Sequence, residues 1–166
     1  MYVNQEARHG LWNYISAHFS MIEKVVGNNY TNEPMAFLLE DSEIQEEIEP
    51  YIMARIVDFE EFIRQYPFDI ISIHDDLHFI IDDPIMECNC GDFSLRWDAA
   101  GNTILERGGT RGETVRCDIQ TLTAMFYGYK RPTYLKRVER LQANDTAVRI
   151  LEDIIPIEQP YFSDYF

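Results

Sequence analysis

Residues 50–68 read PYIMARIVDFEEFIRQYPF, and the rest of the fold is expected to build around them. The first part, Tyr51 to Val57, is mostly apolar and rich in β-branched and aromatic residues, with Arg55 as its one charge. This composition is typical of a strand. We therefore predict a strand over Tyr51 to Val57, in a sheet of at least four strands.

A short amphipathic helix is predicted directly after that strand. Asp58 stands where a helix N-cap belongs, and Glu61 three residues later fits the capping box. Pro67 then ends the helix, because proline cannot continue the backbone hydrogen-bond ladder. The apolar side chains of this helix fall on one face: Phe59, Phe62 and Ile63. Since neither element can bury its apolar side alone, the remaining chain has to pack onto both.

The composition is that of a folded, acidic protein. The chain has 166 residues, of which 46% are hydrophobic, enough for one domain or for one domain and part of another. It carries 29 acidic residues against 14 lysines and arginines, for a net charge of -15. Nucleic acids and anionic membrane surfaces attract basic proteins, so we expect neither as a partner. The negative charge is compatible with cationic small molecules.

Cysteine content and hydropathy indicate a cytoplasmic protein. The chain has an odd number of cysteines, Cys88, Cys90 and Cys117, and no signal peptide is evident. This pattern favours a reducing compartment. The apolar runs are far shorter than the roughly 20 residues that cross a bilayer. We therefore expect a soluble protein in the cytoplasm.

The N-terminal third is expected to contain a helix, a strand and a connector. Apolar residues recur at helical spacing from Glu6 to Val26, which predicts a helix that ends at Gly27. The short apolar run Met35 to Leu39 predicts a strand. The acidic segment Asp41 to Glu49 is predicted to be an exposed connector or a short helix. We place a domain boundary there, between residues 45 and 46.

The remaining chain is predicted to form strands first and helices after, an order typical of an α+β fold. Three helices are expected, the first capped by Asp118, the second running from Pro132 through Leu141, and the third capped by Asp145. Before them, β-branched runs and turn residues predict four strands: residues 69–82, 92–100, 103–107 and 113–118.

Three polar motifs could in principle bind a ligand. His74 and His78 could supply imidazoles to a metal, but no third ligand is evident nearby. Cys88 and Cys90 are closer in sequence than the cysteine pairs of structural zinc sites. The RGGTRG segment at residues 107–112 lacks the dinucleotide and Walker signatures. We therefore expect a solvated loop, a turn and a flexible connection, and no metal or cofactor-binding residue in this chain.

The last six positions contain four aromatic residues: Tyr161, Phe162, Tyr165 and Phe166. Chain ends usually fray, so an end this aromatic is expected to dock against protein. Two interpretations stay open. The tail covers the core of its own domain, or the terminal α-carboxylate, carried by Phe166, is delivered into a neighbouring site as a base.

Four segments together resemble a known enzyme family. In chain order they are EARHGLWNYISAH, PYIMARIVDFEEFIRQYPF, LTAMFYGYKRPTYLKRVERL and QPYFSDYF. They are similar to the C-terminal part of Eis-like (enhanced intracellular survival) acetyltransferases, which belong to the Gcn5-related N-acetyltransferase superfamily. The most specific parts are MARIVD at residues 53–58 and a terminal P-x-F-x-D-x-F pattern: Pro160, Phe162, Asp164 and Phe166.

The resemblance implies two domains. Residues 1–45 would be the C-terminal remnant of the second acetyltransferase-like domain and would supply a helix and a strand. Residues 46–166 would be a sterol-carrier-protein-2-like domain, an α+β fold with a mixed or antiparallel sheet and a C-terminal helical cluster. In this family acetyl-CoA binds to an upstream domain that has no counterpart here. The resemblance therefore implies that this chain alone neither binds acetyl-CoA nor turns it over.

The resemblance also implies a function. The chain would be the C-terminal module of an acetyl-CoA-dependent N-acetyltransferase for aminoglycoside- or polyamine-like amines, homo-oligomeric in its full-length form. Its partners would be the upstream acetyltransferase domains of the same polypeptide. The carboxylate of Phe166 would take a proton from the substrate amine, and Tyr165 stands where the family sometimes has an acidic residue. The alternatives are a stand-alone sterol-carrier-like lipid-binding module, which requires an apolar tunnel, and an assembly domain without catalysis.

Overall fold

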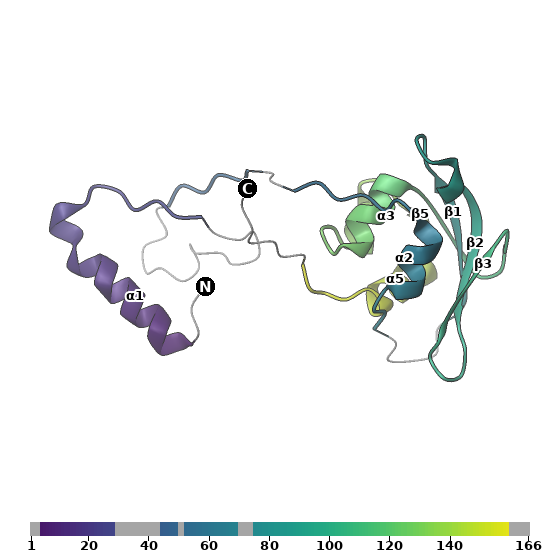
Figure 1. The fold of residues 1–166 in the computed structure, drawn as a ribbon, viewed down its shortest axis with the longest axis horizontal. Helices are drawn as coiled ribbons and strands as arrows, with labels where there is room; N and C mark the ends of the chain where they lie inside the picture. Colours follow the sequence, from purple (N-terminus) through teal and green to yellow (C-terminus); the bar gives the residue numbers. More distant parts are fainter. Residues whose placement is uncertain (1–3, 29–43, 50–51, 70–74, 160–166) are drawn as a thin grey trace. The chain divides into compact units, whose positions relative to one another are not determined.

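A computed structural model describes residues 4–28, 44–49, 52–69 and 75–159 (Figure 1). The chain divides into two compact units, Met1–Pro50 and Tyr51–Phe166, and each is described by itself. Every helix in the described part of the chain is too short or too polar to traverse a lipid bilayer.

Within residues 4–28 and 44–49 of the first unit, the structure shows one α-helix, α1, Gln5–Ala17. Asn4 caps it, because its side chain accepts a hydrogen bond from the Ala7 backbone N–H at 2.8 Å. A single 3₁₀ turn, η1, Phe19–Met21, follows. A helix is therefore present where the sequence predicts one, but the prediction that it extends to Val26 is wrong.

His18 ends α1 by closing its last turn. The backbone N–H of His18 donates to the Ile15 carbonyl, and the ring Nδ1 lies 2.8 Å from the Tyr14 carbonyl oxygen. No residue of α1 is buried. The apolar spacing continues beyond Ala17 but does not locate the end of the helix, which the turn at His18 sets.

The described part of the acidic segment, residues 44–49, is exposed and contains neither helix nor strand. Of the two alternatives predicted for Asp41 to Glu49, these residues form the connector. The strand predicted over Met35 to Leu39 lies outside the described residues. The domain boundary between residues 45 and 46 stays a prediction.

In the described residues of the second unit, five strands form a sheet with the order β3-β2-β1-β4-β5. Its central pair, β1 and β4, is parallel, with Leu77 opposite Glu113, and the other neighbouring strands are antiparallel. This mixed sheet, accompanied by several helices, confirms the predicted α+β fold. The strands are β1 Leu77–Asp82, β2 Gly91–Trp97, β3 Thr103–Arg107, β4 Glu113–Asp118 and β5 Gln142–Ala143.

The predicted bounds are confirmed for two strands, β3 and β4. The strand predicted over residues 92–100 is too long, because β2 ends at Trp97. The turn begins at Asp98, whose carboxylate accepts the backbone N–H groups of Ala100 and Asn102. The strand predicted over residues 69–82 begins only at Leu77, and residues 70–74 lie outside the described part. The short β5 is not predicted from the sequence.

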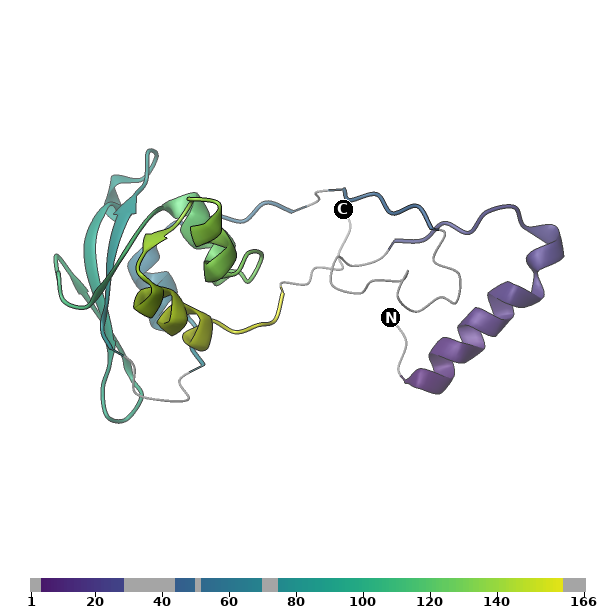
Figure 2. The same ribbon diagram turned by 180° about the vertical axis from the view of Figure 1, so that it is seen from behind.

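Helices cover one face of the sheet. Figures 1 and 2 both show α2, α3 and α5 on the same side of the strands, which gives a two-layer domain. A short 3₁₀ helix, η3 Glu87–Asn89, lies between β1 and β2. The helices are α2 Phe59–Gln65, α3 Ile119–Phe126, α4 Pro132–Arg137 and α5 Asp145–Ile154.

Side-chain caps fix where α2, α3 and α5 begin. Asp58 accepts the Glu61 backbone N–H at 2.9 Å, and Asp118 accepts the Thr121 N–H at 2.7 Å, as predicted. The cap of α5 is Asn144 and not the predicted Asp145, which is the first helical residue. An asparagine oxygen serves a cap as well as a carboxylate does, so the sequence does not distinguish these neighbours.

The core lies between the sheet and the helices. The Phe59 ring from α2 meets the rings of Phe79 and Phe93 edge-on, at centroid distances of 5.9 and 5.0 Å. These contacts fill the interior at the middle of the sheet. The largest fully buried side chains include Phe59, Ile63, Leu77, Phe79, Phe93, Leu95, Ile119, Leu122, Met125, Leu141 and Leu151.

The strand predicted over Tyr51 to Val57 is wrong. The described residues of this stretch, 52–57, belong to no strand, and the sheet is built without them. Only Ile56 is buried, and its backbone N–H donates to the Thr123 hydroxyl at 3.2 Å. Strand propensity reflects how well a segment fits a neighbouring strand. Here the Ile56 N–H is bonded to the Thr123 side chain of α3 and not to a strand.

Candidate functional site

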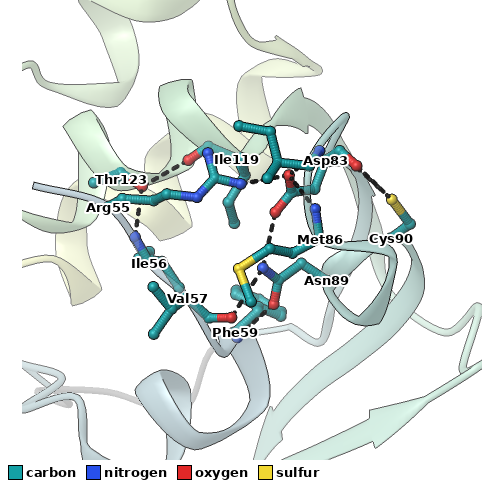
Figure 3. A network of polar contacts seen from close by, with 11 residues as sticks. Arg55, Ile56, Val57, Phe59, Asp83, Met86, Asn89, Cys90, Ile119 and Thr123 are labelled. Atoms are coloured by element: carbon teal, nitrogen blue, oxygen red, sulfur yellow. Dashed lines mark hydrogen bonds and ion pairs between the residues drawn. The ribbon is translucent and has the colours of Figure 1, made fainter.

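The residue predicted to carry the chemistry, Phe166, lies outside the described residues, and so does His74. The role of Phe166 as a base therefore stays a prediction. The described part of the chain contains a cluster of buried polar groups where residues 52–57 enter the second unit. We call it the junction cluster and define it by four residues: Arg55, Asp83, Asn89 and Thr123 (Figure 3).

An ion pair joins the incoming segment to the loop after β1. The Arg55 Nη2 lies 2.5 Å from Asp83 Oδ1, and the Asp83 side chain is fully buried. Arg55 keeps 28% of its side chain exposed. The one charge in the apolar stretch therefore stands opposite a buried carboxylate, which explains why an arginine interrupts that stretch.

Asp83 accepts hydrogen bonds on both carboxylate oxygens. Besides Arg55, Oδ1 receives the backbone N–H groups of Ile85 and Met86 at 3.0 Å each, and Oδ2 receives the Asn89 amide at 2.8 Å. Burial raises the pKa of Asp83, but the bonds from Asn89, from two backbone N–H groups and from Arg55 outweigh burial. They hold the pKa well below its ordinary value. Asp83 is thus an ionised structural group and not a proton acceptor.

Asn89 connects the same loop to helix α2. Its Oδ1 accepts the Phe59 backbone N–H at 2.9 Å, which satisfies a free donor of the first helical turn. Its Nδ2 donates to Asp83 and, at 3.3 Å, to the Val57 carbonyl. Asn89 is almost completely buried. It therefore fixes both the start of α2 and the backbone just before it.

Thr123 holds the incoming segment from the helical side. Its hydroxyl accepts the Ile56 N–H and donates to the Ile119 carbonyl at 2.7 Å, one turn earlier in α3. Figure 3 shows these contacts on one side of the segment and the Asp83 loop on the other. The junction cluster thus holds residues 55–57 from two sides. It can orient a connected segment, but it leaves no group free to react.

Two of the candidate metal residues, His78 and Cys90, have protein partners. His78 Nε2 lies 2.7 Å from Asp92 Oδ1. Cys90 exchanges hydrogen bonds at 3.2 Å with the backbone N–H and carbonyl of Asp83, and Cys88 is exposed. No group of three or more His, Cys, Asp or Glu residues within the described ranges could hold a metal ion.

The RGGTRG segment connects β3 to β4, as predicted. Arg107 Nη1 donates to the Cys88 carbonyl at 2.7 Å and pairs with Glu60 at 3.0 Å, and Arg111 pairs with Asp76 at 2.6 Å. Both arginines of the segment are thereby engaged by protein acceptors.

The best-defined hollow in the described part of the chain lies at the ends of the parallel strands β1 and β4. It measures about 450 Å³. Charged residues line much of it: Asp82, Arg116, Asp118, Glu139 and Arg140. A second hollow, of about 550 Å³, lies beside Lys136 and Glu139. Both are open, so neither resembles the enclosed apolar tunnel that a lipid carrier requires.

Sequence reasoning missed Asp83 and Asn89. The signal was present in IIDDPIMECNC at residues 80–90, where a carboxylate directly follows a buried strand and precedes a proline. A polar residue next to a buried apolar run usually has a buried partner. Arg55, the one charge in its apolar stretch, likewise indicated a buried partner of opposite charge.

Known structures resemble this chain over nearly its whole length. A protein from Enterococcus faecalis, described as a conserved protein of unknown function and a probable N-acyltransferase, is 28% identical with a TM-score of 0.80. The match covers 99% of this chain and 42% of that protein. A GCN5-related N-acetyltransferase from Anabaena variabilis is 26% identical with a TM-score of 0.68, over 95% of this chain and 40% of the other.

A third similar structure shows the fold alone. Eis1 from Mycobacterium abscessus is 16% identical with a TM-score of 0.64, over 97% of this chain and 40% of that chain. This chain therefore spans less than half the length of these three proteins. No curated protein sequence matches it.

Two domain families match consecutive parts of the sequence. Residues 1–56 match the acetyltransferase (GNAT) domain. Residues 59–163, more than half of the chain, match the sterol carrier protein domain. The sheet, helices α2 to α5 and the junction cluster's loop residues all lie within the second match. The chain belongs to the sterol carrier protein domain family.

Proposed function

We propose that this chain is the C-terminal module of an Eis-like, acetyl-CoA-dependent N-acetyltransferase that acts on amines. The observation that carries the proposal is the order of the two family matches, acetyltransferase over residues 1–56 and sterol carrier over 59–163. Support also comes from the Enterococcus faecalis structure, which matches 99% of this chain and is described as a probable N-acyltransferase.

The junction cluster supports this assignment. Arg55 and Ile56 are the last residues of the acetyltransferase match, and both are held by side chains of the sterol carrier domain. The cluster therefore ties the end of the acetyltransferase match to the sterol carrier domain, as expected if both matches belong to one module.

The chemistry that we propose for the module follows the sequence-based prediction for Phe166. An ammonium substrate must lose a proton before its nitrogen can attack a thioester, and a positioned carboxylate can accept that proton. The net charge of -15 favours cationic acceptors such as aminoglycoside- or polyamine-like amines. Acetyl-CoA binding is assigned to upstream acetyltransferase domains, and a homo-oligomer is part of the same proposal.

The test uses the protein made from the complete coding sequence that contains this chain. It is incubated with acetyl-CoA and a panel of diamines, polyamines and aminoglycosides, and free CoA is measured with a thiol reagent. We expect amine-dependent CoA release by that protein and none by the 166-residue chain alone. Absence of release with every amine would refute the assignment.

A lipid-binding assay on the same chain distinguishes the alternative. The open, charged hollows of the described residues predict no saturable uptake of a fluorescent fatty acid or sterol. Stoichiometric uptake together with no acetyl transfer would favour the sterol-carrier-like alternative instead.

A further inference from the structure

Arg131 holds the chain where it leaves helix α5. Its Nη1 donates to the Ile155 carbonyl at 2.9 Å and to the Pro156 carbonyl at 3.0 Å. Its Nη2 and Nε donate to the backbone carbonyl and the carboxylate of Glu152, each at 2.7 Å. All three donor nitrogens of one guanidinium are therefore used on the last turn of α5 and the residues after it.

Glu152 completes this contact from the other side. Its second carboxylate oxygen accepts the Thr133 backbone N–H at 2.8 Å, at the start of α4. Burial raises the pKa of Glu152, but the bonds from Thr133 and Arg131 outweigh burial and lower it. The carboxylate thus stays ionised and ties the end of α5 to the start of α4.

Gly128 makes the next contact with the departing segment. It has φ +70, and a Cβ at this position would stand 2.5 Å from the Glu158 carbonyl oxygen. Figures 1 and 2 both show the segment after α5 passing beside the loop that follows α3. Two backbones therefore meet here at a distance that only glycine permits.

The loop that makes these contacts is itself fixed to the core. The Gly128 N–H donates to the Met125 carbonyl and the Lys130 N–H to the Ala124 carbonyl, both within α3. The ring of Tyr127 stacks on Phe62 of α2 at 5.8 Å. The loop is thus a rigid support and not a flexible neighbour.

We propose that Gly128, Arg131 and Glu152 form an exit clamp, which sets where and in which direction the C-terminal segment leaves the domain. The inference rests on the proposed function in one respect, namely that the segment carries a base to an active site. Residues 160–166 are seven in number and span at most about 23–25 Å when extended. A group at their far end can occupy a reactive position only if its starting point is fixed.

The first test replaces Gly128 with alanine and uses Gly108→Ala as the matched control. Gly108 has φ +74, almost the same as Gly128, but nothing lies within 4 Å of the Cβ position. Both variants incur a similar backbone strain, and only Gly128→Ala pushes on the departing segment. The comparison therefore separates displacement of the segment from loss of a glycine.

Two readouts are measured for each variant. In the 166-residue chain, hydrogen exchange of the Ile155 amide, which donates to the Leu151 carbonyl at 3.1 Å beside the clamp, should accelerate at least about tenfold in Gly128→Ala and stay unchanged in Gly108→Ala. In the protein from the complete coding sequence, a displacement of about 1 Å should lower kcat roughly 10²-fold with little change in KM. Thermal unfolding checks that both variants are folded.

Arg131→Lys gives an independent variant of the clamp. It keeps the charge beside Glu152 but removes the planar fork that reaches two carbonyls at once. Exchange of the Ile155 amide should accelerate, while Arg137→Lys, a change of an exposed arginine at the end of α4, should leave it unchanged.

The outcomes are distinguishable. Unchanged exchange in both clamp variants would overturn the clamp. Faster exchange with unchanged kcat would overturn its positioning role and leave packing alone. If the unmodified protein transfers no acetyl group to any amine, the proposed function fails, and hydrogen exchange still decides whether the clamp exists.

Discussion

Replacing Asp83 with asparagine tests whether the junction cluster holds residues 55–57 in place. The new amide keeps the shape of the side chain, but one carboxylate oxygen becomes a donor. In the best orientation Oδ1 still receives Arg55 and the two backbone N–H groups, and the new NH₂ then faces the Asn89 amide. Two donors would point at each other in a buried site.

The cost has two parts. A buried donor left without an acceptor costs about 1–3 kcal/mol. Removing one charge of a buried ion pair costs about 3–5 kcal/mol, but Arg55 is 28% exposed, so we take about 1–2 kcal/mol for this part. Together the free energy of unfolding should fall by about 3 kcal/mol. For a domain of this size, that lowers Tm by about 10–20 °C.

The assay is urea unfolding of the 166-residue chain, followed by tryptophan fluorescence and circular dichroism. Asp153→Asn, an exposed carboxylate on α5, is the control and should change stability by less than about 0.5 kcal/mol. A loss no larger than that of Asp153→Asn would refute the reasoning.

The stability difference between the unmodified chain and Asp83→Asn should depend on pH, which gives a second check. The pKa of Asp83 is lowered in the folded state, so its ionised form stabilises the protein above the unfolded value of about 3.9. That contribution is lost as the pH falls below about 4. The stability gap between the unmodified chain and Asp83→Asn should therefore be full at pH 7 and shrink as the pH falls from 4 to 2. A gap that stays constant would contradict an ionised Asp83.

Three further predictions concern other parts of the chain. Gly112→Ala should destabilise the chain by about 2 kcal/mol or more, because φ is +110 and a Cβ would stand 2.2 Å from the Asp76 carbonyl oxygen. Gly101→Ala is the control: φ is +83 and the space around the Cβ position is open, so it should cost less in the same urea titration. Burial raises the pKa of the Cys117 thiol to about 12, so iodoacetamide at pH 8 should modify the exposed Cys88 readily and Cys117 only after unfolding, as mass spectrometry of the peptides would show. In the protein from the complete coding sequence, deleting Phe166 should lower kcat about 10²–10⁴-fold while Phe166→Leu stays mild, and near-normal turnover after the deletion would remove this carboxylate from catalysis.

Local signals were enough to predict most of the second unit. The N-caps Asp58 and Asp118 act over three residues, and the structure has them where the sequence predicts them. The fold class followed from the order of strands and helices. Where two neighbouring residues could serve equally, as Asn144 and Asp145 do, the local signal was ambiguous.

Nonlocal contacts could not be predicted from the sequence. The junction cluster joins residues 55, 83, 89 and 123, which no spacing rule connects. The stretch over residues 52–57 has strand composition but no strand partner, because the Thr123 hydroxyl and the Asp83 loop hold it instead. For the same reason the sequence did not predict the exit clamp. The residues KRP at 130–132 indicate only the start of a helix. The contacts of Arg131 form only because the end of α5 packs beside it.

The placement of β1 between β2 and β4 affects how the domain folds while it is being synthesised. Leu77 pairs with Glu113, 36 positions later, whereas the β2–β3 hairpin closes locally. At a synthesis rate of about 5–20 residues per second, one edge of β1 waits roughly 2–7 s for its parallel partner. During that interval the strand LHFIID presents unpaired backbone to any neighbouring nascent chain. Crowded polysomes should therefore favour misassembly at this edge, and a bound chaperone would act there before β4 emerges.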